Sequence, residues 1–427
     1  MSILETVNPS KLRVSILALN YSPESTGIAP YVTRLAEGLA AEGHDVQAIV
    51  GFPHYPEWKP REGYGGWQKR EVLNGVRIKR LRQYIPGTPT TMRRMHLELS
   101  FGARLLFARW GNPDVVLMVT PALFSSALAL LRLRLSRRRP AIGIWVQDIY
   151  SRGLEEIRQG SSTLVSMMRR LEGLVLRSAT GVCVIHERFR DYAVTGLGVR
   201  NQDVVVIRNW THIAVESSID RSAVRERLGW ADHDVVVLHA GNMGAKQGLE
   251  NVVRAAAISD QSRSRVRFAL LGDGNQRRHI EDIAQGINRI QFIDPLPDDE
   301  FEAALSAADM LLVNELPGLR ETAVPSKLTS YFATGLPVVA ATDVNSTTAG
   351  ELAKSRGGVR IEPDNPSALV QIAETLAADQ ELSQALGHAG RMYATNYLSE
   401  DAAILAHGAW LHSLRASKNT ASSTGLK

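Results

Sequence analysis

The sequence predicts an α/β protein made of two Rossmann-like domains that face each other across a cleft. The chain has 427 residues, more than one ordinary hydrophobic core accommodates. Short apolar strands alternate with helical segments in both halves, which is typical of parallel sheets covered by helices. A polar segment at residues 208–220 separates the two series.

These observations predict an N-terminal domain over residues 1–208 and a C-terminal domain over 209–398. A helix over 399–416 is expected to pack back on the N-terminal domain. Residues 417–427, rich in Ser and Thr, are predicted to be a disordered tail.

Each domain is expected to follow the strand–helix alternation. In the first half, a helix over 29–42 is closed by Gly43, and in the second half a helix spans 249–257. Strands are predicted in the first half at 13–19, 46–50, 115–119, 142–146, 181–185 and 204–207, and in the second half at 235–238, 266–271, 290–293, 310–313 and 337–340.

Composition narrows the class of protein. A hydrophobic content of 44% and a charged content of 22% are those of a soluble globular protein. The one cysteine, Cys183, excludes an internal disulfide framework and a cysteine-rich metal site. The N-terminal segment lacks the features of a signal peptide, and no apolar run has the length of a membrane span. We therefore expect a cytoplasmic protein.

Charge is distributed unevenly along the chain. Residues 1–205 hold 28 Lys and Arg against 17 Asp and Glu, whereas residues 206–427 hold 21 against 27. Much of the excess lies in arginine-bearing amphipathic segments at 92–110, 130–139 and 167–177. This pattern favours peripheral contact with an anionic membrane, while a solvated basic helix face is the alternative. No nucleic-acid recognition motif is present, so no nucleic acid is expected as a partner.

The most informative segment is residues 235–253. An apolar strand runs into a glycine turn containing Gly241 and Gly244, and Lys246 follows at the start of a helix. Glycines allow close approach of a ligand to the backbone, and a helix N-terminus favours anions. An ordinary strand–helix connection is the alternative.

Further polar loops follow other predicted strands. Gln147 and Asp148 follow one strand of the first half, Gly272-Asp273-Gly274 follows a strand of the second half, and Ser326-Lys327 begins another helix. Ligands of parallel sheets bind at the carboxyl ends of the strands. Two lysines beside helix N-termini are suited to a diphosphate, and a carboxylate on the opposing domain is suited to transfer of a group to a hydroxyl. The phosphate-binding motifs of kinases and NAD enzymes are absent.

These motifs resemble those of the retaining glycosyltransferases of the GT-B fold, family 4, in particular the transferases of colanic acid and related exopolysaccharide clusters. The resemblance covers nearly the whole chain. It rests on N20-Y-S-P-E-S-T-G-I28, F52-P-H-Y-P-E-W58, V146-Q-D148, R208-N-W210, A240-G-N-M-G-A-K-Q-G-L-E-N251, L271-G-D-G274, V324-P-S-K-L328 and A333-T-G-L-P-V-V339.

The resemblance implies roles for several of these motifs. On the donor side, Lys246 with the Gly241–Gly244 turn would hold the diphosphate, and Ser326, Lys327 and Leu328 would bind the distal phosphate and sugar. Gly272, Asp273 and Gly274 would lie near the base. On the acceptor side it implies Thr26, Gly27, His54, Tyr55 and Gln147. Asp148 would sit near the reacting centre, with Lys246 and Lys327 assisting catalysis.

The sequence departs from the family pattern in three ways, at four positions. Asn242, expected on the donor side, occupies the place of an arginine, and Gln147 that of a catalytic histidine. Ser330 and Thr322 occupy the places of two glutamates, with Glu321 as the neighbouring donor-side carboxylate. These departures keep two alternatives open: a non-catalytic subunit with this fold, or a related nucleotide-sugar epimerase or phosphorylase.

The implied function is transfer of a hexose-type sugar from a nucleotide-diphosphate donor to a lipid-linked or glycan acceptor, with retention of configuration. The reaction would serve cell-surface polysaccharide or glycolipid biosynthesis at the inner face of the plasma membrane. We expect no cofactor and no metal ion, because helix N-termini and two lysines would stabilise the leaving diphosphate.

Overall fold

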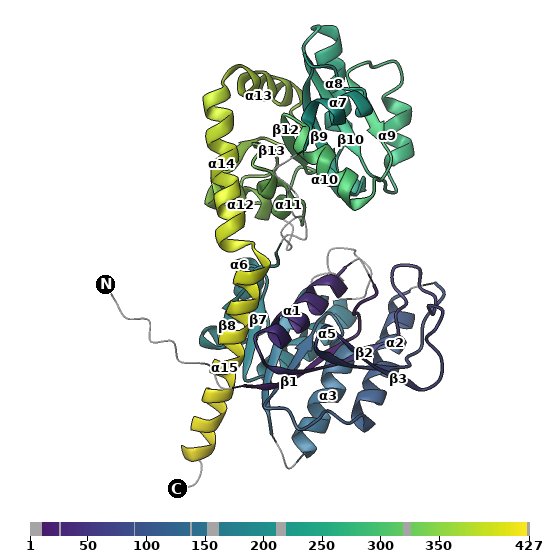
Figure 1. Ribbon diagram of the computed structural model, residues 1–427, viewed down its shortest axis with the longest axis vertical. Coiled ribbons are helices and arrows are strands. Elements are labelled where there is room, and N and C mark those ends of the chain that lie inside the picture. The colour runs from purple at the N-terminus through teal and green to yellow at the C-terminus, as the bar shows by residue number, and fades with distance from the viewer. Residues whose placement is uncertain are drawn as a thin grey trace, which may run out of the picture. The chain divides into compact units, whose positions relative to one another are not determined.

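The computed structural model describes residues 11–24, 27–88, 90–136, 139–151, 162–210, 219–318 and 326–424. The chain divides into two compact units, each an α/β assembly with its own sheet (Figure 1). Unit 1 comprises Met1–Asn209 together with Glu400–Lys427, and unit 2 comprises Trp210–Ser399. The predicted α/β class with largely parallel sheets is confirmed.

Unit 1 contains an eight-stranded sheet in the order β3-β4-β2-β1-β5-β6-β7-β8. The chain order reverses at β1, which pairs with β2 on one side and β5 on the other. The elements of unit 1 are β1 (Arg13–Ala18), α1 (Ala29–Ala41), β2 (Asp45–Gly51), β3 (Gln68–Leu73), β4 (Val76–Leu81), α2 (Thr91–Phe107), β5 (Val115–Val119), α3 (Leu123–Leu135), β6 (Ala141–Val146), α5 (Ser162–Arg177), β7 (Gly181–Val184), α6 (Glu187–Thr195), β8 (Val204–Val206) and α15 (Glu400–Thr424).

One hairpin at the edge of this sheet was not predicted. β3 pairs antiparallel with β4, in contrast to the parallel pairing elsewhere in the sheet. The turn is formed by Asn74 and Gly75, with φ angles of 47° and 80°. Asn-Gly between two strands is the strongest short-range signal of a two-residue hairpin, so the sequence contained the information.

The C-terminal helix α15 belongs to unit 1, where it packs on α1, β5 and β6. Two glycines paired across β6 and β7, Gly143 and Gly181, make room for it. A Cβ at Gly143 would lie 3.0 Å from the Trp410 ring, and one at Gly181 would lie 2.6 Å from Leu414. Larger residues at either position would therefore push the helix off the sheet.

The prediction of a disordered tail from residue 417 is wrong for residues 417–424, because α15 continues to Thr424. Ser417 Oγ donates to the carbonyl of Ser413 at 3.0 Å, and Thr420 Oγ1 donates to that of Ala416 at 2.8 Å. Both hydroxyls therefore bond the carbonyl four residues earlier, as Ser and Thr side chains do inside helices.

Unit 2 contains a six-stranded sheet in the order β11-β10-β9-β12-β13-β14, and its pairings are parallel. The chain order reverses at β9, which lies between β10 and β12. Of these strands, β14 was not predicted. The elements are α7 (Arg221–Leu228), β9 (Val235–Ala240), α8 (Glu250–Gln261), β10 (Val266–Leu271), α9 (Arg277–Ile283), β11 (Ile290–Ile293), α10 (Asp298–Ala307), β12 (Met310–Asn314), α11 (Ser326–Thr334), β13 (Val338–Ala341), α12 (Thr347–Ser355), β14 (Gly358–Ile361), α13 (Pro366–Ala378) and α14 (Gln380–Tyr397).

Candidate functional site

The glycine loops that follow β9 and β10 interlock at the carboxyl edge of the unit 2 sheet. A Cβ at Gly272, where φ is +131°, would lie 2.2 Å from the carbonyl oxygen of Gly241, and one at Gly274 would lie 2.4 Å from that of Met243. Backbone hydrogen bonds join the loops: Met243 N donates to the Asp273 carbonyl at 2.8 Å. The glycines predicted for the donor side therefore form one rigid backbone platform at the point where the chain order reverses.

Lys327, in the first turn of α11, lies against this platform. Its Cε would be 3.2 Å from a Cβ at Gly241, so the missing side chain at Gly241 leaves room for the lysine. Its Nζ lies 2.7 Å from Nε2 of His239, which is fully buried near the end of β9. The structure thus brings the predicted glycine turn and the predicted Ser-Lys helix start together.

His239 is the acceptor in that contact. Burial, and then the positive charge of Lys327, hold the pKa of His239 well below its usual range. The ring is therefore neutral, Nε2 accepts from the lysine ammonium, and the ring proton resides on Nδ1. A neutral acceptor orients the ammonium without adding a negative charge at that contact, which favours an anionic ligand.

A second α11 side chain secures the end of β9. Tyr331 is fully buried, and its hydroxyl accepts from Ala240 N at 2.8 Å and donates to the Ala240 carbonyl at 3.2 Å. Leu328 is also buried and packs in the unit 2 core. Together these contacts hold α11, and with it Lys327, against the strand.

Lys246 lies in a 3-10 turn, Ala245–Gln247, and its side chain is exposed. The turn is held by neighbours in the same motif: Gln247 Oε1 accepts from Gly244 N at 3.0 Å, and Asn314 Nδ2 donates to the carbonyls of Gln247 and Gly248 at 2.7 and 2.9 Å. Asn314 in turn accepts from the buried Asn251 at 2.8 Å. These hydrogen bonds, made by residues of the Lys246–Asn251 run and by Asn314, fix the backbone conformation at Lys246.

The remaining donor-side residues are placed as follows. Asn242 and Asp273 are exposed on the two glycine loops, and Asp273 Oδ1 accepts from Gly274 N at 2.8 Å. Ser326 begins α11, but its side chain lies outside the described residues, as does Glu321.

In unit 1, Gln147 and Asp148 follow β6 directly. Gln147 is buried, and its amide exchanges two hydrogen bonds with the amide of Asn209, at 3.1 and 2.8 Å. Asp148 is exposed, with its Oδ1 accepting from Ile149 N at 2.8 Å. Of these two side chains, Gln147 is therefore buried against Asn209 and Asp148 is exposed. The acceptor role of Gln147 stays a prediction.

The two loops predicted for the acceptor side are joined through Glu24. This buried carboxylate accepts from the backbone N–H groups of His54 and Tyr55, both at 2.8 Å, and from Asn20 Nδ2 at 2.9 Å. His54 itself is buried, whereas Tyr55 is half-buried and lies 3.5 Å from the Cβ position of Gly27. Thr26 lies outside the described residues, and the acceptor roles stay predictions.

Within the described ranges, no group of three or more His, Cys, Asp or Glu side chains is arranged to hold a metal ion. None of the helices in the described part of the chain is long and apolar enough to cross a bilayer.

Comparison with known proteins identifies the family. The family described as "Glycosyl transferase 4-like domain" matches residues 26–210, and "Glycosyl transferases group 1" matches residues 234–379. The chain belongs to the family 4-like, group 1 glycosyltransferases. The glycosyltransferase is 31% identical over 374 residues to the "Putative colanic acid biosynthesis glycosyl transferase WcaI" of Escherichia coli K12, covering 84% of this chain and 90% of the relative.

Solved structures share the fold of this glycosyltransferase. Sucrose-phosphate synthase of Thermosynechococcus elongatus is 18% identical with a TM-score of 0.71, over 95% of this chain and 100% of the other. Anabaena HepE in complex with UDP is 17% identical with a TM-score of 0.69, over 94% and 100% of the two chains. HepE in complex with UDP-glucose is 18% identical with a TM-score of 0.64, over 95% and 99%. The GT-B fold expected from the sequence is confirmed.

Sequence reasoning missed the residues that hold this glycosyltransferase's loops: His239, Asn314, Tyr331 and Glu24. His239 offered a signal, because a histidine in an otherwise apolar strand must find a polar partner when buried. Glu24 lay inside a quoted motif, and its role depends on a loop about thirty residues away. Asn314 and Tyr331 carried no local signal, since their partners lie on other elements.

Proposed function

We propose that the enzyme transfers a sugar from a nucleotide-diphosphate donor bound to unit 2, with retention of anomeric configuration. The observation that carries the proposal is the Lys327–His239 contact of 2.7 Å beside the Gly241 turn. An ammonium oriented by a neutral base, next to a glycine backbone platform, is suited to a diphosphate. That the Anabaena protein of the same fold is seen with UDP and with UDP-glucose supports a nucleotide sugar as the donor.

Lys246 and Lys327 are proposed to stabilise the charge that develops on the leaving diphosphate, and the exposed Asp148 is proposed to act near the reacting centre. Gly272, Asp273 and Gly274 would support the base, and Ser326 and Glu321 would complete the donor side. No cofactor or metal ion is assigned, because two cations supply the electrostatic stabilisation.

The test is a thermal-shift panel of nucleoside diphosphates and their sugars, followed by turnover of alanine variants. UDP or another diphosphate should raise the melting temperature of the wild type, since ligand binding stabilises the folded state. Lys246→Ala and Lys327→Ala should reduce turnover by about a hundredfold. Arg254→Ala, on the same unit and paired with Asp364, is the charge-matched control and should stay near wild type. Turnover of Lys246→Ala within about twofold of wild type would exclude that assignment.

We further propose that the acceptor is a lipid-linked or glycan acceptor of cell-surface polysaccharide or glycolipid biosynthesis, reached at the cytoplasmic face of the plasma membrane. The resemblance to a colanic acid transferase supports the class of product. The membrane contact is supported by helix packing: of the helices that carry the arginine-bearing segments, α2 packs on α3, and α3 packs on α5. Apolar side chains on these helices are exposed, among them Met92, Phe107 and Leu135.

One arginine of those segments has a structural role instead. Arg132 is half-buried, and its guanidinium donates to the carbonyl oxygens of Leu105 and Ala108, at 2.6 and 2.5 Å, at the end of α2.

Sedimentation with vesicles tests the proposed membrane contact of the helices that carry these segments. The wild type should bind vesicles containing phosphatidylglycerol and not pure phosphatidylcholine. Met92→Ser with Phe107→Ser should reduce that binding, and failure of the wild type on both kinds of vesicle would contradict it.

A further inference from the structure

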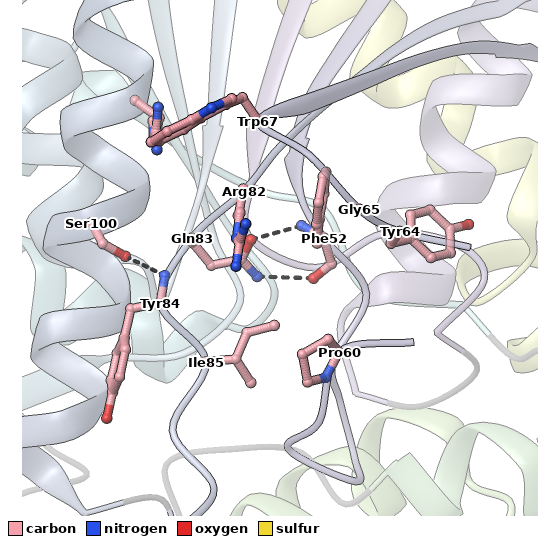
Figure 2. A pocket seen from close by; sticks show the side chains of 11 residues that line it. Phe52, Pro60, Tyr64, Gly65, Trp67, Arg82, Gln83, Tyr84, Ile85 and Ser100 are labelled. Carbon is pink, nitrogen blue, oxygen red and sulfur yellow. Dashed lines mark hydrogen bonds between the residues drawn. The ribbon is translucent and has the colours of Figure 1, made fainter. Parts of the chain in front are cut away.

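Unit 1 contains a cavity of 670 Å³ beside the carboxyl ends of β2 and β4 (Figure 2). Phe52 follows β2 directly, and Arg82 to Ile85 follow β4. Ser100 and Arg104 of α2 line it as well. No residue assigned to the acceptor side from the sequence lines this cavity, although Phe52 adjoins the loop that contains His54 and Tyr55.

The back of the cavity is fixed by hydrogen bonds. The side chain of Gln83 bonds both backbone groups of Phe52, accepting from its N–H and donating to its carbonyl, each at 2.8 Å (Figure 2). Tyr84 N donates to Ser100 Oγ at 2.8 Å, which links the segment after β4 to α2. The Gln83–Phe52 bonds are buried and the Tyr84–Ser100 bond is exposed, and together they hold the cavity in shape within unit 1.

Two aromatic residues, Trp67 and Tyr84, line the cavity. Trp67 is 68% exposed, and the guanidinium carbon of Arg104 lies 4.1 Å from its ring centre. Tyr84 stacks on His96 with 4.4 Å between ring centres. Tyr84 is 37% exposed. Aromatic rings that are partly exposed and held in place by stacking provide flat apolar surfaces on which the C–H face of a pyranose can pack.

The charged side chains that line the cavity are all positive. Arg82 and Arg104 contribute guanidinium groups, and none of the eleven described residues that line the cavity is acidic. Within the described part of the chain, the exposed Arg82 makes no ion pair with a carboxylate. Guanidinium groups bind phosphates and carboxylates through paired N–H donors, so the cavity is complementary to an anion.

We infer that this cavity binds an anionic sugar of the acceptor: a pyranose that carries a phosphate ester or a carboxylate. Trp67 and Tyr84 pack against the sugar ring, and the guanidinium groups of Arg82 and Arg104 bind its phosphate or carboxylate. The inference rests on the proposed function, because it presumes that unit 1 binds the acceptor, and it deepens that function by assigning a chemical class to the acceptor.

Saturation-transfer NMR and calorimetry on the full-length protein test it, with glucose 6-phosphate, glucuronate and glucose as probes. At least one of the two anionic sugars should bind fivefold or more tightly than glucose, and which of them does so distinguishes phosphate from carboxylate. Arg82→Gln should weaken that binding at least fivefold. Arg200→Gln, which removes an exposed arginine of unit 1 that pairs with Asp203 and lies outside the cavity, is the matched control and should leave it unchanged.

Titration with UDP separates this inference from the proposed function. Arg82→Gln should bind UDP as the wild type does, whereas Lys327→Ala should bind the anionic sugar as the wild type does. If the wild type does not bind UDP, the donor proposal is refuted and the inference about the cavity is not. The inference is overturned if glucose binds as tightly as the anionic sugars, if Arg82→Gln binds them unchanged, or if none of the three sugars binds the wild type.

Discussion

The ammonium of Lys327 and the ring of His239 are hydrogen-bonded at 2.7 Å across 88 positions of sequence. The direction of the bond is set by burial, which keeps the histidine neutral and makes Nε2 the acceptor. His239 is thus a positioning residue for a lysine that the proposed mechanism places on the donor diphosphate.

Removing the acceptor nitrogen of His239 should misplace Lys327. We expect His239→Leu to weaken UDP binding about tenfold, because a hydrogen bond to a charged group contributes roughly 1.5–3 kcal/mol. His239→Gln, which keeps an acceptor, should lose less than threefold. Calorimetry gives the affinities, and melting curves establish that both variants fold. Equal UDP affinity in His239→Leu and wild type would show that Lys327 needs no such support.

The interlocked glycine loops should tolerate no side chain at Gly272. A Cβ there meets Gly241 O at 2.2 Å, whereas Gly286, also in the left-handed region with φ of +81°, has nothing within 4 Å of its Cβ position. Gly272→Ala should therefore destabilise unit 2 by about 3 kcal/mol or more, and Gly286→Ala by only about 1 kcal/mol. Urea unfolding followed by fluorescence compares them. Similar losses in the two variants would mean that backbone strain, not overlap, dominates.

Glu98 should make the protein less stable as pH rises. This carboxyl on α2 accepts from Phe124 N at 2.9 Å, and burial raises its pKa to about 8. The folded state keeps the proton while the unfolded chain, with a pKa near 4.5, loses it, so stability falls between pH 4.5 and 8.

Glu98→Gln should abolish that part of the pH dependence. The amide oxygen of glutamine still accepts from Phe124, and it does not ionise. The variant should match wild type near pH 5 and exceed it by up to about 4 kcal/mol at pH 8.5, as judged by urea midpoints. If the urea midpoints of the wild type and Glu98→Gln change with pH in parallel, Glu98 is not protonated in the folded state.

His407 should have the opposite effect, at acid pH. Its Nδ1 bonds the Ala403 carbonyl at 2.8 Å, its ring packs edge-on against Trp145 at 4.8 Å, and burial lowers its pKa to about 4. The unfolded chain takes up a proton near pH 6.5 and the folded state does not, so stability is lost as pH falls from 6.5 to 4.

His407→Phe keeps a ring against Trp145 and cannot be protonated. The variant should lose up to about 3 kcal/mol less stability than wild type between pH 7 and pH 4. Urea midpoints at the two pH values measure the difference. An unchanged acid dependence would exclude His407 as its source.

Local patterns in the sequence were sufficient for most of the architecture. Strand periodicity located most of the strands on which the candidate sites are built, because a strand buried on both faces must be apolar along its length. Glycines at 241, 272 and 274 were recognisable because they lie in turns that directly follow apolar strands. The Asn74-Gly75 hairpin could have been predicted on the same local basis.

The sequence by itself thus determined the α/β class, the parallel strands and the loops that bear the candidate site residues. Only the tertiary structure decided which side chains meet: Lys327 with His239, Gln147 with Asn209, and Glu98 with the start of α3. Periodicity reports whether a residue faces a core, which is a property of a few neighbouring positions. Hydrogen-bond partners depend on which distant segments become adjacent when the sheet forms, and on the burial that then sets their charge.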